Sequence, residues 1–358
     1  MIRPGDYLIE DIINGGYVTA LFQPLVYIKK KAVVGYSSFC PGCDHEGYEI
    51  DAAALVDSAE RFGLVLQIDR LFRRKSLEGF SSLYAADRGM LLALNVNSGA
   101  IMSGARSGNF INMVRNAGIE PSDIIIELIE SDIDETGVIT DFAARYREAG
   151  FMIAIDESGC GTLNWDRVAM IKPDLVKLDS SMITGVAADF FKQEVLHSRI
   201  NLAHKGGALV VAAGIDTVED ALKMMELGAD ILQGNYFSPP CRPEEISRDE
   251  IDRKIARISG LYRRQVEERR RGRIEFLERN MGLLDGIIGD MLKVEPGSME
   301  RVLAAAIKKY GTVECIYVLD DSGMQITGTV LNMDLLKARV SRILHPDSIA
   351  TDQSNKDY

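Results

Sequence analysis

The chain has 358 residues, 46% of them hydrophobic, and a formal net charge of −12 at pH 7. This length exceeds one average domain, but a single α/β barrel takes up about 250 residues, so one large domain and a smaller one are expected. The negative charge repels phosphate backbones and anionic lipid surfaces. It therefore excludes wholesale nucleic-acid binding and leaves an anionic ligand only a local site.

The N-terminal stretch and the cysteines indicate a cytoplasmic protein. Acidic residues interrupt MIRPGDYLIEDIINGGY, where a signal peptide needs a continuous apolar run, and no run of about 18 apolar residues follows. The five cysteines are too few and too scattered for a disulfide framework in a chain of this size. We therefore expect a reducing cytoplasm and no membrane segment.

Short apolar runs, each followed by a helix-like stretch, recur along residues 1–245. Eight of them are predicted strands: 21–28, 33–39, 91–96, 124–128, 152–155, 175–178, 209–212 and 231–232. The runs are continuous, as in strands buried on both faces, and the helices between them favour parallel pairing. The connection between the first two strands, residues 28–32, is too short for a parallel crossover. These two strands should therefore be antiparallel. The sequence predicts a TIM-like (β/α)8 barrel over residues 1–245 with an antiparallel first strand pair.

A long charged helix follows the predicted barrel, and we assign residues 246–297 to a helical linker. Glutamates flank the arginine-rich stretch 269–273 at helical neighbour distances, which favours a solvated helix face over a nucleic-acid site. Residues 298–358 are predicted to form a small α/β domain. It has a helix over 299–310 capped by Ser298, and strands over 314–319 and 324–330. Two strands and one helix bury no complete core, which suggests a truncated chain or strands supplied by a partner.

Most residues at the ends of the predicted barrel strands are polar. The strand-end residues are Ser37, Asn95, Glu127, Asp156 with Glu157, Lys177, Ala213 and Gln233. Oxygen donors and a lysine at one end of a barrel suit Mg²⁺, Mn²⁺ or Ca²⁺ beside a phosphate. Two plainer interpretations stay open. Asn95, Glu127 and Asp156 could cap helices or bond strand-end backbone groups, and Lys177 could be a simple ion-pair partner.

Several motifs occur in a fixed order over about residues 10–245. They are LFQPLV at Leu21, VVGYSSF at Val33, NVN at Asn95, IELIES at Ile126, IDESG at Ile155, VKLD at Val176, AAGID at Ala212 and LQGNYFSPP at Leu232. Together they resemble the EAL-domain family of cyclic di-GMP phosphodiesterases. The resemblance implies hydrolysis of cyclic di-GMP to its linear dinucleotide by water activated between two divalent cations.

The resemblance also implies roles for individual residues. Asn95, Glu127 and Asp156 fall on metal ligands of the family, and Lys177 falls on the lysine beside the hydrolytic water. Gln233 falls on the late glutamine of the site, and Gln23, in the first motif, and Asp216 are further candidate ligand-binding residues.

Other positions depart from the family pattern. Ser37 replaces the glutamate that names the family, Pro41 replaces the arginine shortly after it, and Ala213 replaces the strand-seven glutamate. Glu157 stands for the second aspartate of a pair, and Asp216 for a later glutamate. Losing two carboxylates weakens the field that holds a second cation. The loop SGCGTLNW also differs from the family segment associated with dimerisation and with ordering the site.

Two features outside these motifs allow alternatives. Cys40 and Cys43 form a Cys-x-x-Cys pair that, with His45 and Cys160, could bind zinc or act in redox chemistry, although such a pair is often incidental. Trp165 could pack beneath the barrel rim or anchor a partner. Residues 317–330 are also similar to part of a PAS-like or Cache-like sensory domain.

We therefore expect a catalytically impaired EAL-type barrel that regulates or binds other proteins in cyclic di-GMP signalling, with a protein partner or a homodimer. Lys177 and Glu157 would carry any residual catalysis, with one divalent cation (Mg²⁺, Mn²⁺ or Ca²⁺) at most. A weakly active phosphodiesterase and a non-hydrolysing cyclic di-GMP receptor remain alternatives. The loss of arginine at Pro41 argues against tight binding of the dinucleotide.

Overall fold

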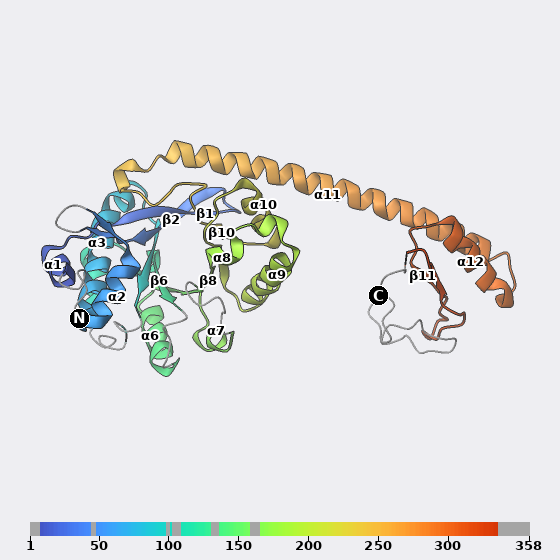
Figure 1. The fold of residues 1–358 in the computed structure, drawn as a ribbon, viewed down its shortest axis with the longest axis horizontal. Helices are drawn as coiled ribbons and strands as arrows, with labels where there is room; N and C mark the ends of the chain where they lie inside the picture. The colour runs from blue at the N-terminus through green and yellow to red at the C-terminus, as the bar shows by residue number, and fades with distance from the viewer. Residues whose placement is uncertain are drawn as a thin grey trace. The chain divides into compact units, whose positions relative to one another are not determined.

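The computed structural model describes residues 8–43, 48–97, 101, 109–129, 136–157 and 165–335 (Figure 1). They fall into two compact units, the first ending at Arg264 and the second beginning at Gln265. Within the described residues, no helix is both long enough and apolar enough to cross a membrane.

The first unit is built on a closed barrel of eight strands, which confirms the predicted fold. The strands are β1 (Leu21–Tyr27), β2 (Ala32–Phe39), β5 (Leu91–Val96), β6 (Ile124–Ile129), β7 (Met152–Asp156), β8 (Leu175–Leu178), β9 (Leu209–Ala212) and β10 (Ile231–Leu232). Around the barrel they follow the order β1-β10-β9-β8-β7-β6-β5-β2. β1 runs antiparallel to both β2 and β10, and the other neighbouring pairs are parallel.

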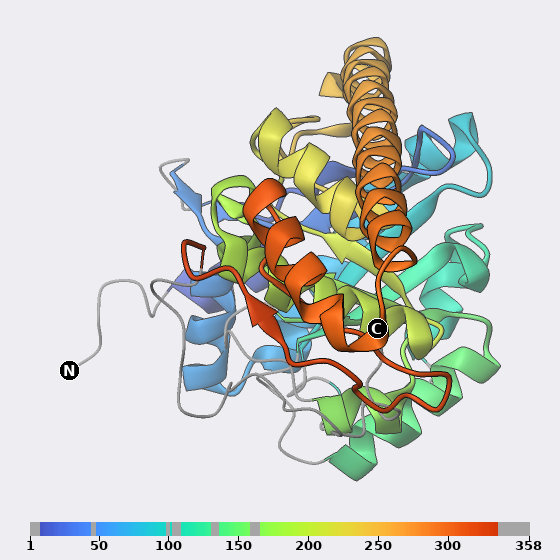
Figure 2. The same ribbon diagram turned by 90° about the vertical axis from the view of Figure 1, so that its right-hand side faces the viewer.

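Helices cover the outside of the barrel (Figures 1 and 2). They are α1 (Leu8–Gly15), α2 (Ala52–Phe62), α3 (Val65–Ala86), α5 (Asn109–Asn116), α6 (Thr136–Glu148), α7 (Trp165–Ile171), α8 (Ser180–Ile183), α9 (Phe190–Lys205) and α10 (Val218–Leu227). The main hydrophobic core lies between these helices and the strands. Two short strands after β2, β3 (Gly42–Cys43) and β4 (Glu49–Ile50), pair antiparallel.

Local sequence signals set the helix ends. The Asp51 carboxylate accepts from the Ala53 N–H at the start of α2, and Thr217 accepts from the Asp220 N–H at the start of α10. Gly63 and Gly228 end these two helices with φ of 69° and 100°, a conformation that glycine adopts without strain.

The second unit contains the C-terminal part of α11 (Arg248–Met291), α12 (Met299–Lys309), β11 (Cys315–Ile316) and β12 (Val330–Leu331). α12 packs on α11 through Ile287, Leu303 and Ala306 (Figure 2). β11 and β12 pair antiparallel.

One local prediction in this second unit is wrong, and another is confirmed in part. The Ser298 side chain makes no capping hydrogen bond, because a short 3-10 turn over Pro296–Ser298 leads directly into α12. The two predicted strands do pair antiparallel around the turn: the Ile326 N–H donates to the Val318 carbonyl at 2.9 Å, and Leu319 and Gln325 form an isolated bridge. Regular strand, however, is limited to Cys315–Ile316 and Val330–Leu331. Between these pairs the buried Gln325 amide donates to the Thr327 carbonyl and to the Thr329 hydroxyl.

A buried carboxylate joins three segments of the first unit just before β10. Asp230 accepts from the Val210 N–H at 3.0 Å and from Lys29 Nζ at 3.0 Å, and its Oδ2 lies 2.6 Å from His204 Nε2. Burial alone would raise the pKa of Asp230, but these partners outweigh burial and hold the pKa below its ordinary value.

We expect Asp230→Asn to lower the free energy of unfolding by about 2 kcal/mol at pH 7, because hydrogen bonds to a charged acceptor are lost. Since the folded pKa is lowered, this contribution is present above the ordinary value of 3.8 and is lost as the pH falls through the folded pKa. The difference from the native sequence, measured by urea unfolding, should therefore shrink below about pH 4. Asp141→Asn, at an exposed position on α6, is the control and should change little. A loss that stays constant down to pH 3 would contradict this interpretation.

Candidate functional site

The candidate site is a layer of side chains above an apolar plug in the barrel. The plug consists of Leu25, Ala93, Ile125, Ala154, Leu175, Val211 and Ile231. Side chains two positions apart lie on the same face of a strand. The next residue to point into the barrel therefore lies two positions from each plug residue, toward the end of the barrel where the site is expected. These next residues are Gln23, Asn95, Glu127, Asp156, Lys177, Ala213 and Gln233, all of them predicted site positions.

Three of these residues form a buried ionic triad. Lys177 Nζ lies 2.9 Å from Glu127 Oε2 and 2.9 Å from Asp156 Oδ2, and all three side chains are buried. Burial raises the pKa of Glu127, although the Lys177 charge opposes the rise. Burial would lower the pKa of Lys177, but the two carboxylates outweigh it and raise that pKa above its ordinary range. Lys177 therefore stays positively charged between two buried acids.

Glu157 takes a different direction from its neighbour Asp156. It is 1% exposed, and its carboxylate accepts two hydrogen bonds from Arg199 Nη1 on α9, at 2.9 and 3.2 Å. Burial raises the pKa of Glu157, and the Arg199 guanidinium opposes this rise. The strand period explains the divergence, since consecutive residues of an extended chain point to opposite faces. Arg199 was not predicted, because no motif marks the helix position that covers this carboxylate.

Two glutamines of the same layer are joined by a hydrogen bond. Gln233 Nε2 donates to Gln23 Oε1 at 2.9 Å, and Gln23 Nε2 donates to Asn235 Oδ1 at 3.2 Å. Ser37 is the cross-strand partner of Gln23 and is completely buried. Among the described residues, Ser37 Oγ and Gln233 Oε1 are buried polar atoms that have no hydrogen-bond partner. Both atoms can therefore accept a contact from a bound molecule.

The other predicted positions are less buried than the ionic triad. Asn95 is exposed at the end of β5, next to Glu127 in the strand register. Asp216 is exposed beyond β9, and Ala213 and Pro41 are half-buried. The structure thus brings together Glu127, Asp156 and Lys177, and separately Gln23 with Gln233.

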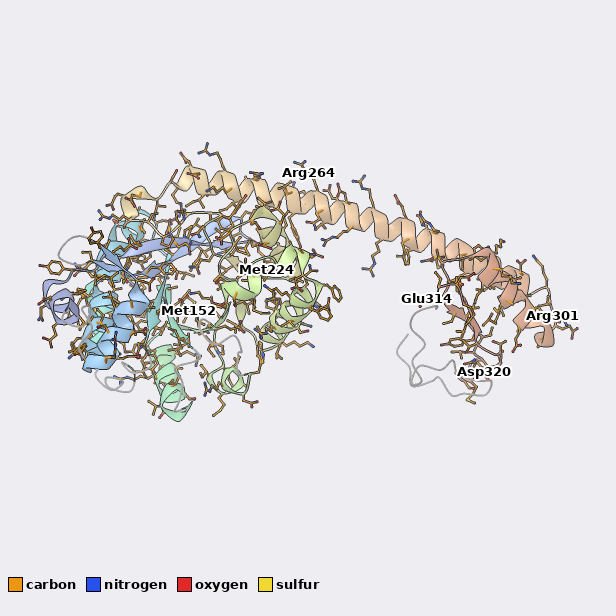
Figure 3. All side chains as sticks on the ribbon, in the orientation of Figure 1. Met152, Met224, Arg264, Arg301, Glu314 and Asp320 are labelled. Atoms are coloured by element: carbon orange, nitrogen blue, oxygen red, sulfur yellow. The ribbon has the colours of Figure 1, made fainter. Side chains whose placement is uncertain are left out.

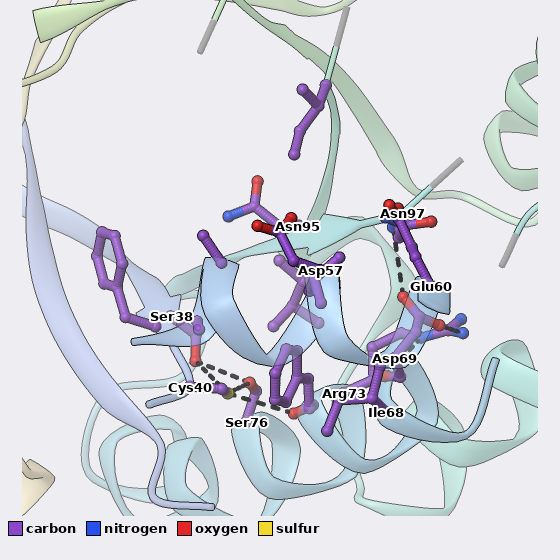
Figure 4. Close-up of a pocket in the computed structure, with 17 residues that line it drawn as sticks. Ser38, Cys40, Asp57, Glu60, Ile68, Asp69, Arg73, Ser76, Asn95 and Asn97 are labelled. Atoms are coloured by element: carbon purple, nitrogen blue, oxygen red, sulfur yellow. Dashed lines mark hydrogen bonds and ion pairs between the residues drawn. The ribbon is translucent and has the colours of Figure 1, made fainter. Parts of the chain in front are cut away.

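A pocket of about 510 Å³ lies beside Asn95, between the ends of β2 and β5 and helices α2 and α3 (Figure 4). Arg73 and Asp69 form a buried ion pair in its wall, and the Arg73 guanidinium lies 4.8 Å from the centre of the Phe110 ring. Burial lowers the pKa of Arg73 to about 10. The Asn97 N–H donates to Asp69 Oδ1 at 3.4 Å, so the ion pair also holds the chain that leaves β5.

The two described cysteines of the predicted cluster make unrelated contacts. Cys40 Sγ lies 3.3 Å from Ser76 Oγ (Figure 4), whereas Cys43 Sγ donates to the Tyr17 carbonyl at 4.0 Å. Burial raises the pKa of the Cys40 thiol. In the part of the chain that the structure describes, no three His, Cys, Asp or Glu side chains meet as a metal site needs. His45 and Cys160 lie outside the described residues, so the complete cluster stays a prediction.

Trp165 begins α7 and packs, partly buried, against the main barrel core. This position agrees with the packing interpretation of the single tryptophan. The altered loop just before it, residues 158–164, lies outside the described residues.

Comparison with known proteins finds cyclic di-GMP phosphodiesterases and an EAL-domain containing protein among the relatives of this chain. The chain is 25% identical over 150 residues to the cyclic di-GMP phosphodiesterase PdeL of Escherichia coli, which covers 42% of this chain and 41% of PdeL. It is 23% identical over 343 residues to the EAL-domain containing protein YkuI of Bacillus subtilis, with 93% of this chain and 81% of YkuI covered. This chain therefore spans less than half the length of PdeL but most of YkuI.

Solved structures agree on the fold. The crystal structure of Bacillus subtilis YkuI, in complex with its substrate c-di-GMP and calcium, has a TM-score of 0.78 at 22% identity and covers 90% of this chain and 81% of YkuI. The EAL domain of FimX from Pseudomonas aeruginosa, bound to c-di-GMP, has a TM-score of 0.60 at 17% identity and covers 67% of this chain and 97% of that domain. The model of the EAL domain matches residues 9–240, which is more than half of the chain, and this protein belongs to the EAL domain family.

Proposed function

We propose that this chain is a degenerate EAL-domain protein of cyclic di-GMP signalling that regulates or binds other proteins and does not hydrolyse the dinucleotide. The observation that carries the proposal is the Glu157–Arg199 pair. In this pair the Arg199 guanidinium binds the Glu157 carboxylate, and the family pattern places a carboxylate at this position in the metal site. We also retain residues 1–245, 246–297 and 298–358 as barrel, helical linker and PAS-like or Cache-like part, in a cytoplasmic protein.

The remaining donors support one cation at most. Glu127 and Asp156 point into the barrel mouth and share Lys177, and Asn95 stands next to Glu127 in the register. Ser37 and Ala213 offer no carboxylate at the two positions where the family has one. With Glu157 bound to Arg199, a second divalent cation has too few hard oxygen ligands. A two-metal hydrolysis is therefore not supported by these side chains.

Two alternatives differ from the proposal in one measurable property each. A weakly active phosphodiesterase would need Glu157 to leave Arg199 and bind a cation. A receptor would bind cyclic di-GMP and release no product.

The first test combines a cyclic di-GMP hydrolysis assay with calorimetric titration in Mg²⁺, Mn²⁺ or Ca²⁺. We expect no linear product from the native chain. Restoring the family carboxylates in the double variant Ser37→Glu, Ala213→Glu should tighten cation binding by about tenfold or more, because two ligand charges are added. Ala144→Glu, at an exposed position on α6, is the matched control. Turnover by the native chain at the rate of a related phosphodiesterase would refute the proposal, and tight dinucleotide binding without product would favour the receptor.

The second test concerns Lys177. Lys177→Met should lower the free energy of unfolding by roughly 3–5 kcal/mol at pH 7, because Glu127 and Asp156 are left buried without their counter-charge. Since burial already raises the pKa of Glu127, protonation should recover part of this loss as the pH falls toward 5. If Glu127 and Asp156 can hold a cation, Ca²⁺ should raise the melting temperature of this variant more than that of the native chain.

Lys205→Met, at an exposed position on α9, is the control for this test. Equal Ca²⁺ responses of Lys177→Met and the native chain would argue against any cation at these carboxylates. A loss of stability below about 1 kcal/mol would contradict the buried ion triad itself.

A further inference from the structure

An exposed apolar stripe runs along α11 in the second unit. We call it the seam, and it consists of Ile274, Leu277, Met281, Leu284 and Ile288. These side chains are between 45% and 58% exposed. Figure 3 shows side chains projecting from α11 along the stretch that follows Arg264. Large apolar side chains this exposed at regular intervals indicate an interaction surface.

The seam is distinct from the face of α11 that packs on α12. That packed face carries Ile287, which is 4% exposed, with Leu283 and Met291 partly buried against Leu303 and Ala306. α11 therefore uses one stripe for its own unit and presents a second, neighbouring stripe to solvent.

The spacing of the seam selects another helix as its partner. Seam residues alternate at intervals of three and four, which is the heptad repeat with Ile274, Met281 and Ile288 at position a and Leu277 and Leu284 at position d. This repeat keeps an apolar line facing a second helix as the two coil around each other. β-branched residues at a with leucine at d favour two parallel strands. The glycines of this stretch, Gly282, Gly286 and Gly289, fall at the outer positions b and f.

The flanking charges select a parallel copy of the same helix. Arg273, at position g, lies five residues before Glu278, at position e, and both are exposed. In a parallel pair, position g of one helix faces position e of the next heptad in the other, so Arg273 would meet the partner's Glu278. An antiparallel pair would place Glu278 near the partner's Asp285, which is repulsive.

We propose that residues 273–288 of α11 form a parallel two-stranded coiled coil with the same segment of a second copy of this chain. The segment begins at Arg273 because Glu267 and Arg270 would occupy positions a and d of the preceding heptad. The segment ends at Ile288 because Met291, at the next position d, packs with Ile287, Leu303 and Ala306 of its own unit. The interface does not depend on the proposed function, since none of its residues belongs to the barrel.

The first test measures the monomer–dimer equilibrium of the full chain by sedimentation. Leu284→Glu, which places a charge in the seam, should raise the dissociation constant by at least about tenfold. Phe276→Glu is the matched control, because Phe276 is 61% exposed but lies at the outer position c. The far-ultraviolet circular dichroism spectrum should stay the same in both variants. A native chain that is monomeric at 100 μM, or a Leu284→Glu variant that dimerises as tightly as the native chain, would overturn the proposal.

The second test addresses the parallel register and leaves the apolar seam intact. Arg273→Glu and Glu278→Arg, made singly, should each raise the dissociation constant by about fivefold, because each creates two like-charge pairs across the dimer. The double variant Arg273→Glu, Glu278→Arg should restore native affinity. Failure of the double variant to recover, with both single variants weakened, would exclude the parallel pairing.

Discussion

The two-residue period of the barrel strands determines what the site can contain. A layer of apolar side chains fills the barrel interior, and the next inward residue of each strand is then fixed in place above it. This constraint puts Glu127, Asp156 and Lys177 side by side although they lie far apart in the sequence. It also sends Glu157 to the opposite face, where it meets Arg199. The strand period therefore brings the three residues of the ionic triad together and directs the Glu157 carboxylate away from them.

The negative charge of the two carboxylates in the site is partly neutralised by a lysine, whereas in a metal centre a bound cation has this role. Two buried carboxylates would strongly favour a divalent cation, but the Lys177 ammonium already lies 2.9 Å from each of them. A cation that binds there adds to an existing positive charge, so its affinity depends on ligands beyond the pair. Ser37 and Ala213 supply no such charge, and Glu157 is held by a guanidinium. These charges support the proposal that the site holds one cation at most.

The sequence predicted the barrel more completely than the site. Each of the eight strands was placed within one residue at both ends, because strands buried on both faces leave continuous apolar runs between helices. Residue identity also indicated the triad, since strand-end acids and a lysine must converge. The Glu157–Arg199 pair could not be predicted, because it depends on where α9 lies against the barrel. The Ser298 cap was mispredicted because a local turn replaced it, and the predicted strand pair around residues 320–323 is present but irregular.

α11 shows how one sequence pattern can serve separate purposes along a single helix. Ile251, Ile255 and Ile258 are buried against the barrel, and Ile287 is buried against α12, so each compact unit uses its own set of apolar residues. The charged stretch 267–273 between them has no apolar residue at all, which explains why it is exposed throughout. The seam starts directly after this stretch, yet its five residues contribute to neither hydrophobic core. An apolar repeat that neither core requires is better explained by a second helix than by the folding of one chain.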